Sequence, residues 1–121
     1  MNLAEYQERA MTTCLQASEN FLYMFLNLVG EAGEVSSKVG KLIRKGKIEF
    51  SENKLIFKDF SDSEKQEFLE DMKKELGDVL WQLSGTCTVL GFSLEEVAKI
   101  NLDKLASRKA RGVVDGNGDN R

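Results

Sequence analysis

Two stretches of the sequence, GEAGEVSSK at residues 30–38 and ELGDVLW at residues 75–81, decide the fold of this chain. Each contains two acidic residues three positions apart, and apolar residues continue on both sides at spacings of three and four. In an α-helix, residues with that spacing lie on one face. Both stretches therefore predict long helices that carry an acidic pair beside an apolar stripe, in an all-α fold.

Four helices are expected along the chain, because it has no proline and the same apolar spacing extends outward from both stretches. The expected ranges are about Leu3–Ala17, Asn20–Arg44, Ser61–Gly91 and Ser93–Arg108. Candidates for the buried stripe of the second helix are Tyr23, Phe25, Leu28, Ala32, Val35, Val39 and Leu42. The pattern predicts an arrangement like a four-helix bundle.

Two segments lack this periodicity. Between the second and third helices, IEF and LIF flank SENK, which indicates a short hairpin or an irregular loop inserted at about 47–60. The final segment RGVVDGNGDNR, residues 111–121, is rich in Gly, Asn and Asp and is typical of a loop or arm. The expected organisation is an all-α domain over residues 1–110, followed by a tail over 111–121.

The composition of the 121 residues excludes several classes of function. Seventeen Lys and Arg against 20 Asp and Glu give a net charge of -3, which argues against a nucleic-acid polymer as partner. The absence of histidine removes the Ser-His and Cys-His nucleophile schemes and most catalytic zinc sites. Any metal site must therefore be built from oxygen ligands.

Cysteine usage and hydropathy indicate a reduced, cytoplasmic protein. Cys14 and Cys87 lie far apart in the sequence, in apolar or small-residue surroundings typical of free thiols. The longest apolar run, at 21–29, is too short to span a bilayer, and the first residues lack the features of a secretory signal. We expect no membrane partner.

The two acidic pairs point to a metal site. If the second and third helices pack together, Glu31, Glu34, Glu75 and Asp78 converge, and such carboxylates repel one another unless a cation is present. Mg²⁺ suits an all-oxygen site and Mn²⁺ is a second candidate, whereas iron sites in helical bundles add histidine. The alternative is four solvated carboxylates. Glycines inside or beside both pairs favour a close approach of the helices.

The last expected helix presents polar side chains in its apolar sector. At about 100° per residue, Asn101, Lys104 and Arg108 project in the direction of the apolar stripe. Long basic side chains at such an edge either extend to solvent or bind phosphate groups. Trp81, three residues beyond Asp78, either stacks on a nucleobase or packs in the core, and packing is the commoner role.

In combination, these motifs resemble those of the MazG-like family of all-α nucleoside triphosphate pyrophosphohydrolases. The resemblance covers nearly the whole chain, from NLAEYQERAMTT at residues 2–13 through both acidic motifs and the NxxKxxxR helix to RGVVDGNGDNR. It implies Mg²⁺-dependent hydrolysis between the α- and β-phosphates, which yields a nucleoside monophosphate and pyrophosphate. The gap between the acidic motifs is longer here than in compact members, and the extra length coincides with residues 46–60.

The resemblance also implies roles for individual residues. Glu31, Glu34, Glu75 and Asp78 match the family's metal ligands and, with Lys38, are the candidate catalytic residues. Positions that contact phosphate or sugar are matched by Lys38, Asn101, Lys104 and Arg108, and Trp81 is a further candidate for substrate binding.

Three hypotheses follow. The first is a homo-oligomeric enzyme, a dimer or tetramer, that hydrolyses nucleoside triphosphates, with deoxy or noncanonical ones favoured. The second is a phosphoribosyl-ATP pyrophosphohydrolase, although the NxxKxxxR helix and the GDNR tail look less like that branch. The third is a non-enzymatic helical interaction module whose acidic pairs are merely solvated.

Overall fold

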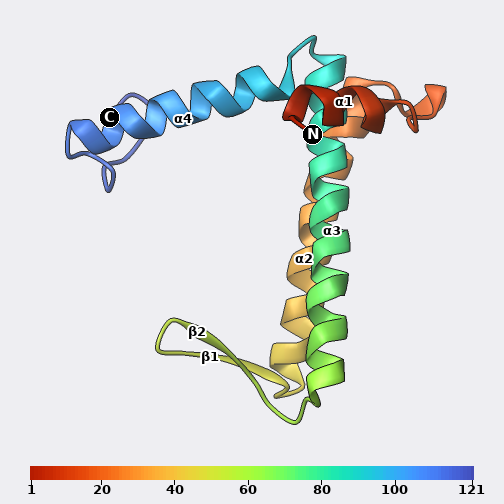
Figure 1. Cartoon of the computed structure of the whole chain (residues 1–121), viewed down its shortest axis with the longest axis vertical. Coiled ribbons are helices and arrows are strands. Elements are labelled where there is room, and N and C mark those ends of the chain that lie inside the picture. The colour runs from red at the N-terminus through yellow and green to blue at the C-terminus, as the bar shows by residue number, and fades with distance from the viewer.

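The computed structural model describes residues 1–121 as four α-helices, a short 3-10 helix and a two-stranded hairpin. The helices are α1 (Leu3–Met11), α2 (Phe21–Arg44), α3 (Asp62–Val89) and α4 (Leu94–Ala110), η1 spans Gln16–Ser18, and the strands are β1 (Ile48–Ser51) and β2 (Lys54–Phe57). In Figure 1, α2 and α3 lie side by side as a long antiparallel pair, with the hairpin at one end and α1 and α4 at the other. The expected all-α class and the inserted hairpin are confirmed.

The α2–α3 pair is tightest near the start of α2. Met24 is completely buried, and a Cβ added at Gly85 would lie 2.3 Å from its sulfur. Glycine at position 85 therefore opens the notch in α3 that Met24 fills. The predicted stripe is wrong at Tyr23, Phe25 and Ala32, which are exposed, because this notch selects a neighbouring face of α2.

The first helix ends at Met11, six residues before the predicted end at Ala17. Thr12 and Thr13 donate their hydroxyl hydrogens to the carbonyls of Arg9 and Ala10, and Trp81 on α3 donates its Nε1–H to the Ala10 carbonyl at 3.1 Å. These bonds satisfy carbonyls at the end of α1. A partner 71 positions away is not visible in the local pattern.

Gln7 fixes the junction between α3 and α4. Its Nε2 donates to Thr88 Oγ1 at 3.0 Å and to the Phe92 carbonyl at 2.9 Å, and its Oε1 accepts from the Leu94 amide at 2.8 Å. One side chain of α1 thus forms hydrogen bonds with groups at the end of α3, in the connecting loop and at the start of α4. From this junction α4 extends away from the α2–α3 pair (Figure 1).

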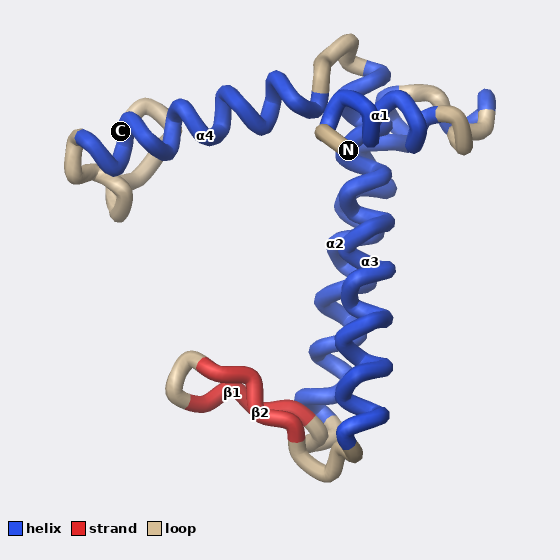
Figure 2. The backbone as a smooth tube through the Cα atoms, in the orientation of Figure 1, coloured by secondary structure: helices blue, strands red, loops and turns tan.

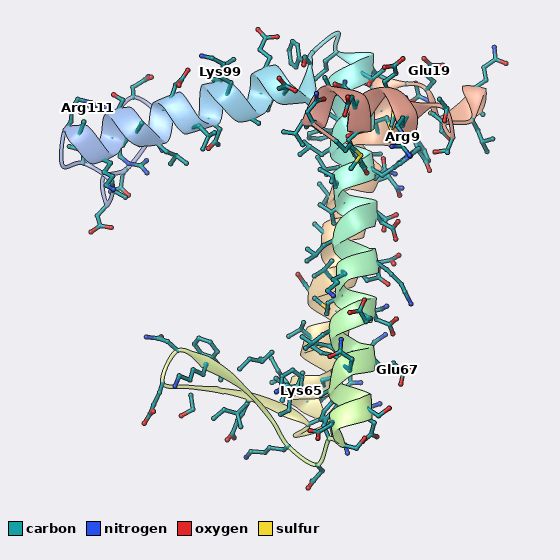
Figure 3. All side chains as sticks on the ribbon, in the orientation of Figure 1. Arg9, Glu19, Lys65, Glu67, Lys99 and Arg111 are labelled. Atoms are coloured by element: carbon teal, nitrogen blue, oxygen red, sulfur yellow. The ribbon has the colours of Figure 1, made fainter.

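The hairpin is anchored at its base and ends in a tight turn (Figure 2). Ile48 is 1% exposed, and the rings of Phe57, Phe60 and Phe68 contact one another at centroid distances of 5.4–6.5 Å. In Figure 3, Lys65 lies on the hairpin side of α3, where its ammonium is 5.0 Å from the centre of the Phe57 ring. Glu52 and Asn53 at the tip have φ of 50° and 60°, the left-handed pair that two-residue hairpin turns require.

The single chain leaves an unusually large surface in contact with solvent. Its accessible area is 8864 Å², whereas a compact monomer of 13.6 kDa exposes about 6,600 Å². Much of the excess is apolar: on the first half of α2 the exposed residues include Phe21, Leu22, Phe25, Leu26 and Val29. None of the helices is both long enough and apolar enough to cross a membrane.

Candidate functional site

Packing of α2 against α3 brings three acidic side chains together. Carboxylate oxygens of Glu31, Glu34 and Glu75 all lie within 4.8 Å of one another. Asp78, one turn beyond Glu75, falls outside this group and instead lines the neighbouring pocket with Glu31. The two ExxE and ExxD spacings thus place all four carboxylates along one seam between the helices.

The electrostatics of this seam are those of crowded like charges. Partial burial, followed by the negative charges of Glu34, Asp78 and Glu75, raises the pKa of Glu31. The amide of Asn27 offsets part of this effect by donating Nδ2–H to Glu31 Oε1 at 3.4 Å. Lys38 forms an ion pair with Glu75, and this hydrogen bond raises the pKa of Lys38.

The glycines beside the acidic pairs do not bring the helices together. A Cβ added at Gly33 or Gly77 would meet no atom within 4 Å, so the expectation of close helix approach at these positions is wrong. The close approach occurs instead at Gly85. Gly33 and Gly77 leave open space on the surface beside the carboxylates.

A pocket of about 300 Å³ adjoins the carboxylate group. Its walls come from Tyr23, Asn27, Glu31, Asp78, Trp81 and Gln82. Gln82 is 3% exposed, and its Oε1 is buried without a hydrogen-bond partner, so one wall residue of the pocket has an unsatisfied acceptor. Trp81 borders the pocket while its Nε1–H is bonded to the Ala10 carbonyl and to Thr13 Oγ1.

Sequence reasoning overlooked four polar residues of this region. Asn27 precedes Glu31 by four positions and Gln82 follows Asp78 by four, so the helical spacing that picked out the carboxylates also indicates these two amides. Tyr23 is a third wall residue. Tyr6 comes from α1, and burial together with the charge of Asp78 raises its pKa. No local pattern links Tyr6 to α3.

The polar residues of α4 are not brought to the carboxylates within one chain. Asn101 lines an apolar groove with Leu80, Leu83 and Leu94. Lys104 and Arg108 lie further along α4, in the half that extends away from the α2–α3 pair (Figure 1). Both form ion pairs with Asp119 of the tail, at 3.2 and 3.1 Å.

Arg108 holds the tail against α4. Its side chain is 7% exposed, and its Nη2 donates to the carbonyls of Gly118 and Asp119 as well as to the Asp119 carboxylate. Arg121 bonds in turn to carbonyls of the tail, including that of Val113 at 3.2 Å. The Nε of Arg108 is buried without a partner. Lys104 and Arg108 hold the pKa of Asp119 below its usual range.

The carboxylate group fits a hard divalent cation. Mg²⁺ binds oxygen at about 2.0–2.1 Å, so the three carboxylates, whose oxygens lie within 4.8 Å of one another, would have to move closer together to hold it directly. The donor set is carboxylate only, and no histidine or thiolate is available to favour zinc or iron. Glu31, Glu34 and Glu75 could hold such an ion.

An all-α fold with facing acidic pairs on two long helices defines a class of helical carboxylate proteins suited to divalent-metal chemistry. Residues 19–113 match the family model of the MazG nucleotide pyrophosphohydrolase domain, and the chain belongs to that family. Among curated proteins it is similar to the Gene 37 protein of Mycobacterium phage L5, with 40% identity over 103 residues that cover 85% of this chain and 78% of that protein. No solved structure gives a significant match.

Membership in the family defines the general activity. It supports nucleotide pyrophosphohydrolase activity, and proteins of this family generally depend on a divalent metal. The resemblance expected from the acidic motifs and the last helix is confirmed.

Proposed function

We propose that this protein hydrolyses nucleoside triphosphates between the α- and β-phosphates and releases a nucleoside monophosphate and pyrophosphate, with deoxy or noncanonical nucleotides preferred. The observation that carries the proposal is the group of three carboxylates within 4.8 Å beside a pocket with an unsatisfied buried acceptor. Family membership supports the class of reaction.

In this proposal Mg²⁺, for which Mn²⁺ can substitute, is held by some of the four carboxylates of Glu31, Glu34, Glu75 and Asp78. The metal supplies an activated water and neutralises phosphate charge. The seam explains why a cation is needed: the like charges that raise the pKa of Glu31 are relieved when a positive ion lies between them. A carboxylate not engaged as a ligand is placed to accept the proton of the attacking water.

The other residues bind the substrate. Lys38 forms an ion pair with Glu75 in this structure, and in this proposal its ammonium also binds a phosphate oxygen of the substrate. Gln82 Oε1 accepts a hydrogen bond from a base or sugar donor that enters the pocket, and Trp81 borders the same space. Asn101, Lys104 and Arg108 contact phosphate or sugar.

We further propose that two copies together form each complete site, within a dimer or tetramer. The half of α4 that carries Lys104 and Arg108 extends away from the carboxylates of its own chain (Figure 1), and in this proposal these cations exchange their ion pairs with Asp119 for the phosphates bound at a site on a second copy. Exposed apolar residues on α2, including Leu22, Leu26 and Val29, support association.

The test is a nucleotide panel scored for pyrophosphate, with and without Mg²⁺. We expect equimolar monophosphate and pyrophosphate from at least one deoxy or noncanonical triphosphate, and no turnover in chelator. Release of inorganic phosphate, or faster turnover of phosphoribosyl-ATP than of every nucleoside triphosphate, would overturn the proposed reaction.

Thermal unfolding without nucleotide tests the metal site separately. A ligand that binds only the folded chain stabilises it by RT ln(1 + [L]/Kd), so millimolar Mg²⁺ is expected to raise the melting temperature. A flat melting temperature across that range, together with no turnover, would favour a non-enzymatic interaction module.

A further inference from the structure

The β1–β2 hairpin carries an apolar face that the chain covers only at its base. In the observed register Ile48 pairs with Phe57 and Phe50 pairs with Leu55, and alternation places these four residues on one face. Ile48 is 1% exposed, whereas Phe50 is 71% exposed and Leu55 is 43% exposed. The face is thus continuous, but its outer half lies in solvent.

The structure of the hairpin argues that this outer half has a partner. Its turn has the conformation that keeps two strands in register, and its base is held by the Phe57, Phe60 and Phe68 rings. A two-stranded hairpin is marginally stable in water unless a third element covers its apolar face. The anchored base fixes the direction of the hairpin, but no third element of the chain covers the apolar face of its outer half.

A second uncovered apolar surface lies on α4. Its stripe begins at Leu94, which is 3% exposed, and continues on the same face to Leu102 and Leu105, which are 66% and 46% exposed. The first turns of the stripe line a groove with Leu3 and Leu83. Leu102 still lines this groove, whereas Leu105, about one turn further along α4, lies outside it and is 46% exposed.

The positions of these two surfaces are complementary under two-fold symmetry. The hairpin and α4 project to the same side from opposite ends of the α2–α3 pair (Figures 1 and 2). If two copies pack with their α2–α3 pairs antiparallel, the hairpin end of each copy meets the α4 end of the other. Both contacts then form at once, as an isologous interface requires.

The exposed area is large enough for the partner to be a second copy. The chain exposes about 2,300 Å² more than a compact monomer of its mass, while a stable interface buries about 800 Å² on each partner. We propose that the β1–β2 hairpin is a dimerisation arm whose Phe50–Leu55 face packs on the Leu102–Leu105 stripe of α4 in a second copy. The inference deepens the homo-oligomer of the proposed function, because it names the surfaces that join the copies.

The first experiment removes the apolar face of the arm. The double variant Phe50→Ser with Leu55→Ser leaves Ile48 and the aromatic base intact, and Ile56→Ser is the matched control because Ile56 is 39% exposed on the opposite face. By light scattering over a concentration series, we expect the dimer Kd to rise about 100-fold in the double variant, since the face is buried twice per dimer. The control is expected to stay within about threefold of wild type.

The second experiment tests the α4 partner directly. One preparation carries Phe50→Cys and another carries Leu105→Cys, both with Cys14→Ser, so that a short bis-maleimide, which adds one thiolate at each end, joins the introduced cysteines only between different copies. When the Phe50→Cys and Leu105→Cys preparations are mixed, we expect a covalent dimer. When an Ile56→Cys preparation replaces the Phe50→Cys preparation, we expect none. Crosslinking that is equal for both positions would overturn the assigned face.

The outcomes separate this inference from the proposed reaction. A double variant that dissociates while wild type shows no nucleotide turnover supports the arm and contradicts the proposed function. A double variant that stays dimeric overturns the arm, and a raised KM in that dimer would identify the hairpin as a lid over the site instead. A strictly monomeric wild-type chain at micromolar concentration overturns the arm as well.

Discussion

The carboxylates between α2 and α3 and the cations on α4 differ in how their charges are neutralised. On α2 and α3 three carboxylates crowd within 4.8 Å, and Lys38 neutralises one of them. On α4, Lys104 and Arg108 share the carboxylate of Asp119, and tail carbonyls accept further bonds from Arg108. The α4 cluster is balanced within the chain, whereas the acidic seam retains like-charge repulsion that a bound cation would relieve.

This difference separates the energetics of function from those of folding. Repulsion in the seam lowers the stability of the metal-free fold, and a cation bound between the carboxylates would relieve it. The tail contacts of Arg108 stabilise local structure and need no ligand. Substitutions in the two regions are therefore expected to affect stability and activity differently.

The largest expected effect is on turnover, from Glu34→Gln. This substitution keeps the side-chain size and removes a proposed metal ligand, so we expect turnover to fall about 100-fold or more while the metal-free fold is unchanged or slightly stabilised. The control is Glu67→Gln, whose side chain points away from α2 in Figure 3. Near-normal turnover of Glu34→Gln in saturating Mg²⁺ would contradict the role of Glu34 as a metal ligand and the proposal that the acidic seam serves activity.

A smaller loss of activity is expected from Lys104→Ala. It removes a proposed phosphate contact but no metal ligand, so turnover should fall about 10- to 100-fold while the Mg²⁺-induced rise in melting temperature is retained. Lys99→Ala is the matched control, because Lys99 lies on the same helix in an exposed pair with Asp103. If Lys104→Ala is inactive only because it unfolds, α4 has a structural role alone.

The next effect is on the metal-free melting temperature. The raised pKa of Glu31 means that the folded chain favours its protonated form, so the stability it contributes is present at low pH and is lost as pH rises through the raised value. We expect Glu31→Gln to raise the melting temperature by about 2–4 °C at about pH 7 and to have little effect at about pH 4. Equal effects at both pH values would show that like-charge repulsion is not the cause.

The smallest effect is local, from Asp119→Asn. Because its pKa is lowered, Asp119 contributes its full stabilisation of the tail at pH values above the ordinary pKa of Asp. This stabilisation is lost as the pH falls through the lowered pKa. We expect exchange of the Gly116 amide, which donates to the Val113 carbonyl at 3.1 Å, to quicken about three- to tenfold at about pH 5. The global melting temperature should not change, and a drop of several degrees would contradict a purely local role.

Local signals in the sequence predicted most of the secondary structure. Asn20, Ser61 and Ser93 accept hydrogen bonds from backbone amides at the starts of α2, α3 and α4, and Gly46 and Gly91 follow α2 and α3 with positive φ. Such caps depend on a few neighbouring residues, so the bounds of these helices could be predicted closely.

Other features depend on distant partners and could not be predicted. The end of α1 is set by Trp81, the direction of α4 by Gln7, and the buried face of α2 by Gly85. Helical spacing predicted which carboxylates share a face, because that is a local property. Whether α4 reaches them depends on how whole helices are oriented, which no short motif encodes.

The hydrogen bonds of Trp81 also make the chain its own optical probe. It is the only tryptophan, it borders the pocket that contains Glu31 and Asp78, and its indole N–H is bonded to α1. Its fluorescence therefore reports a single place, where the end of the first helix meets the candidate nucleotide pocket. Emission that shifts on nucleotide addition but not on Mg²⁺ alone would show, without any added label, that the nucleotide and not the metal alters the surroundings of Trp81.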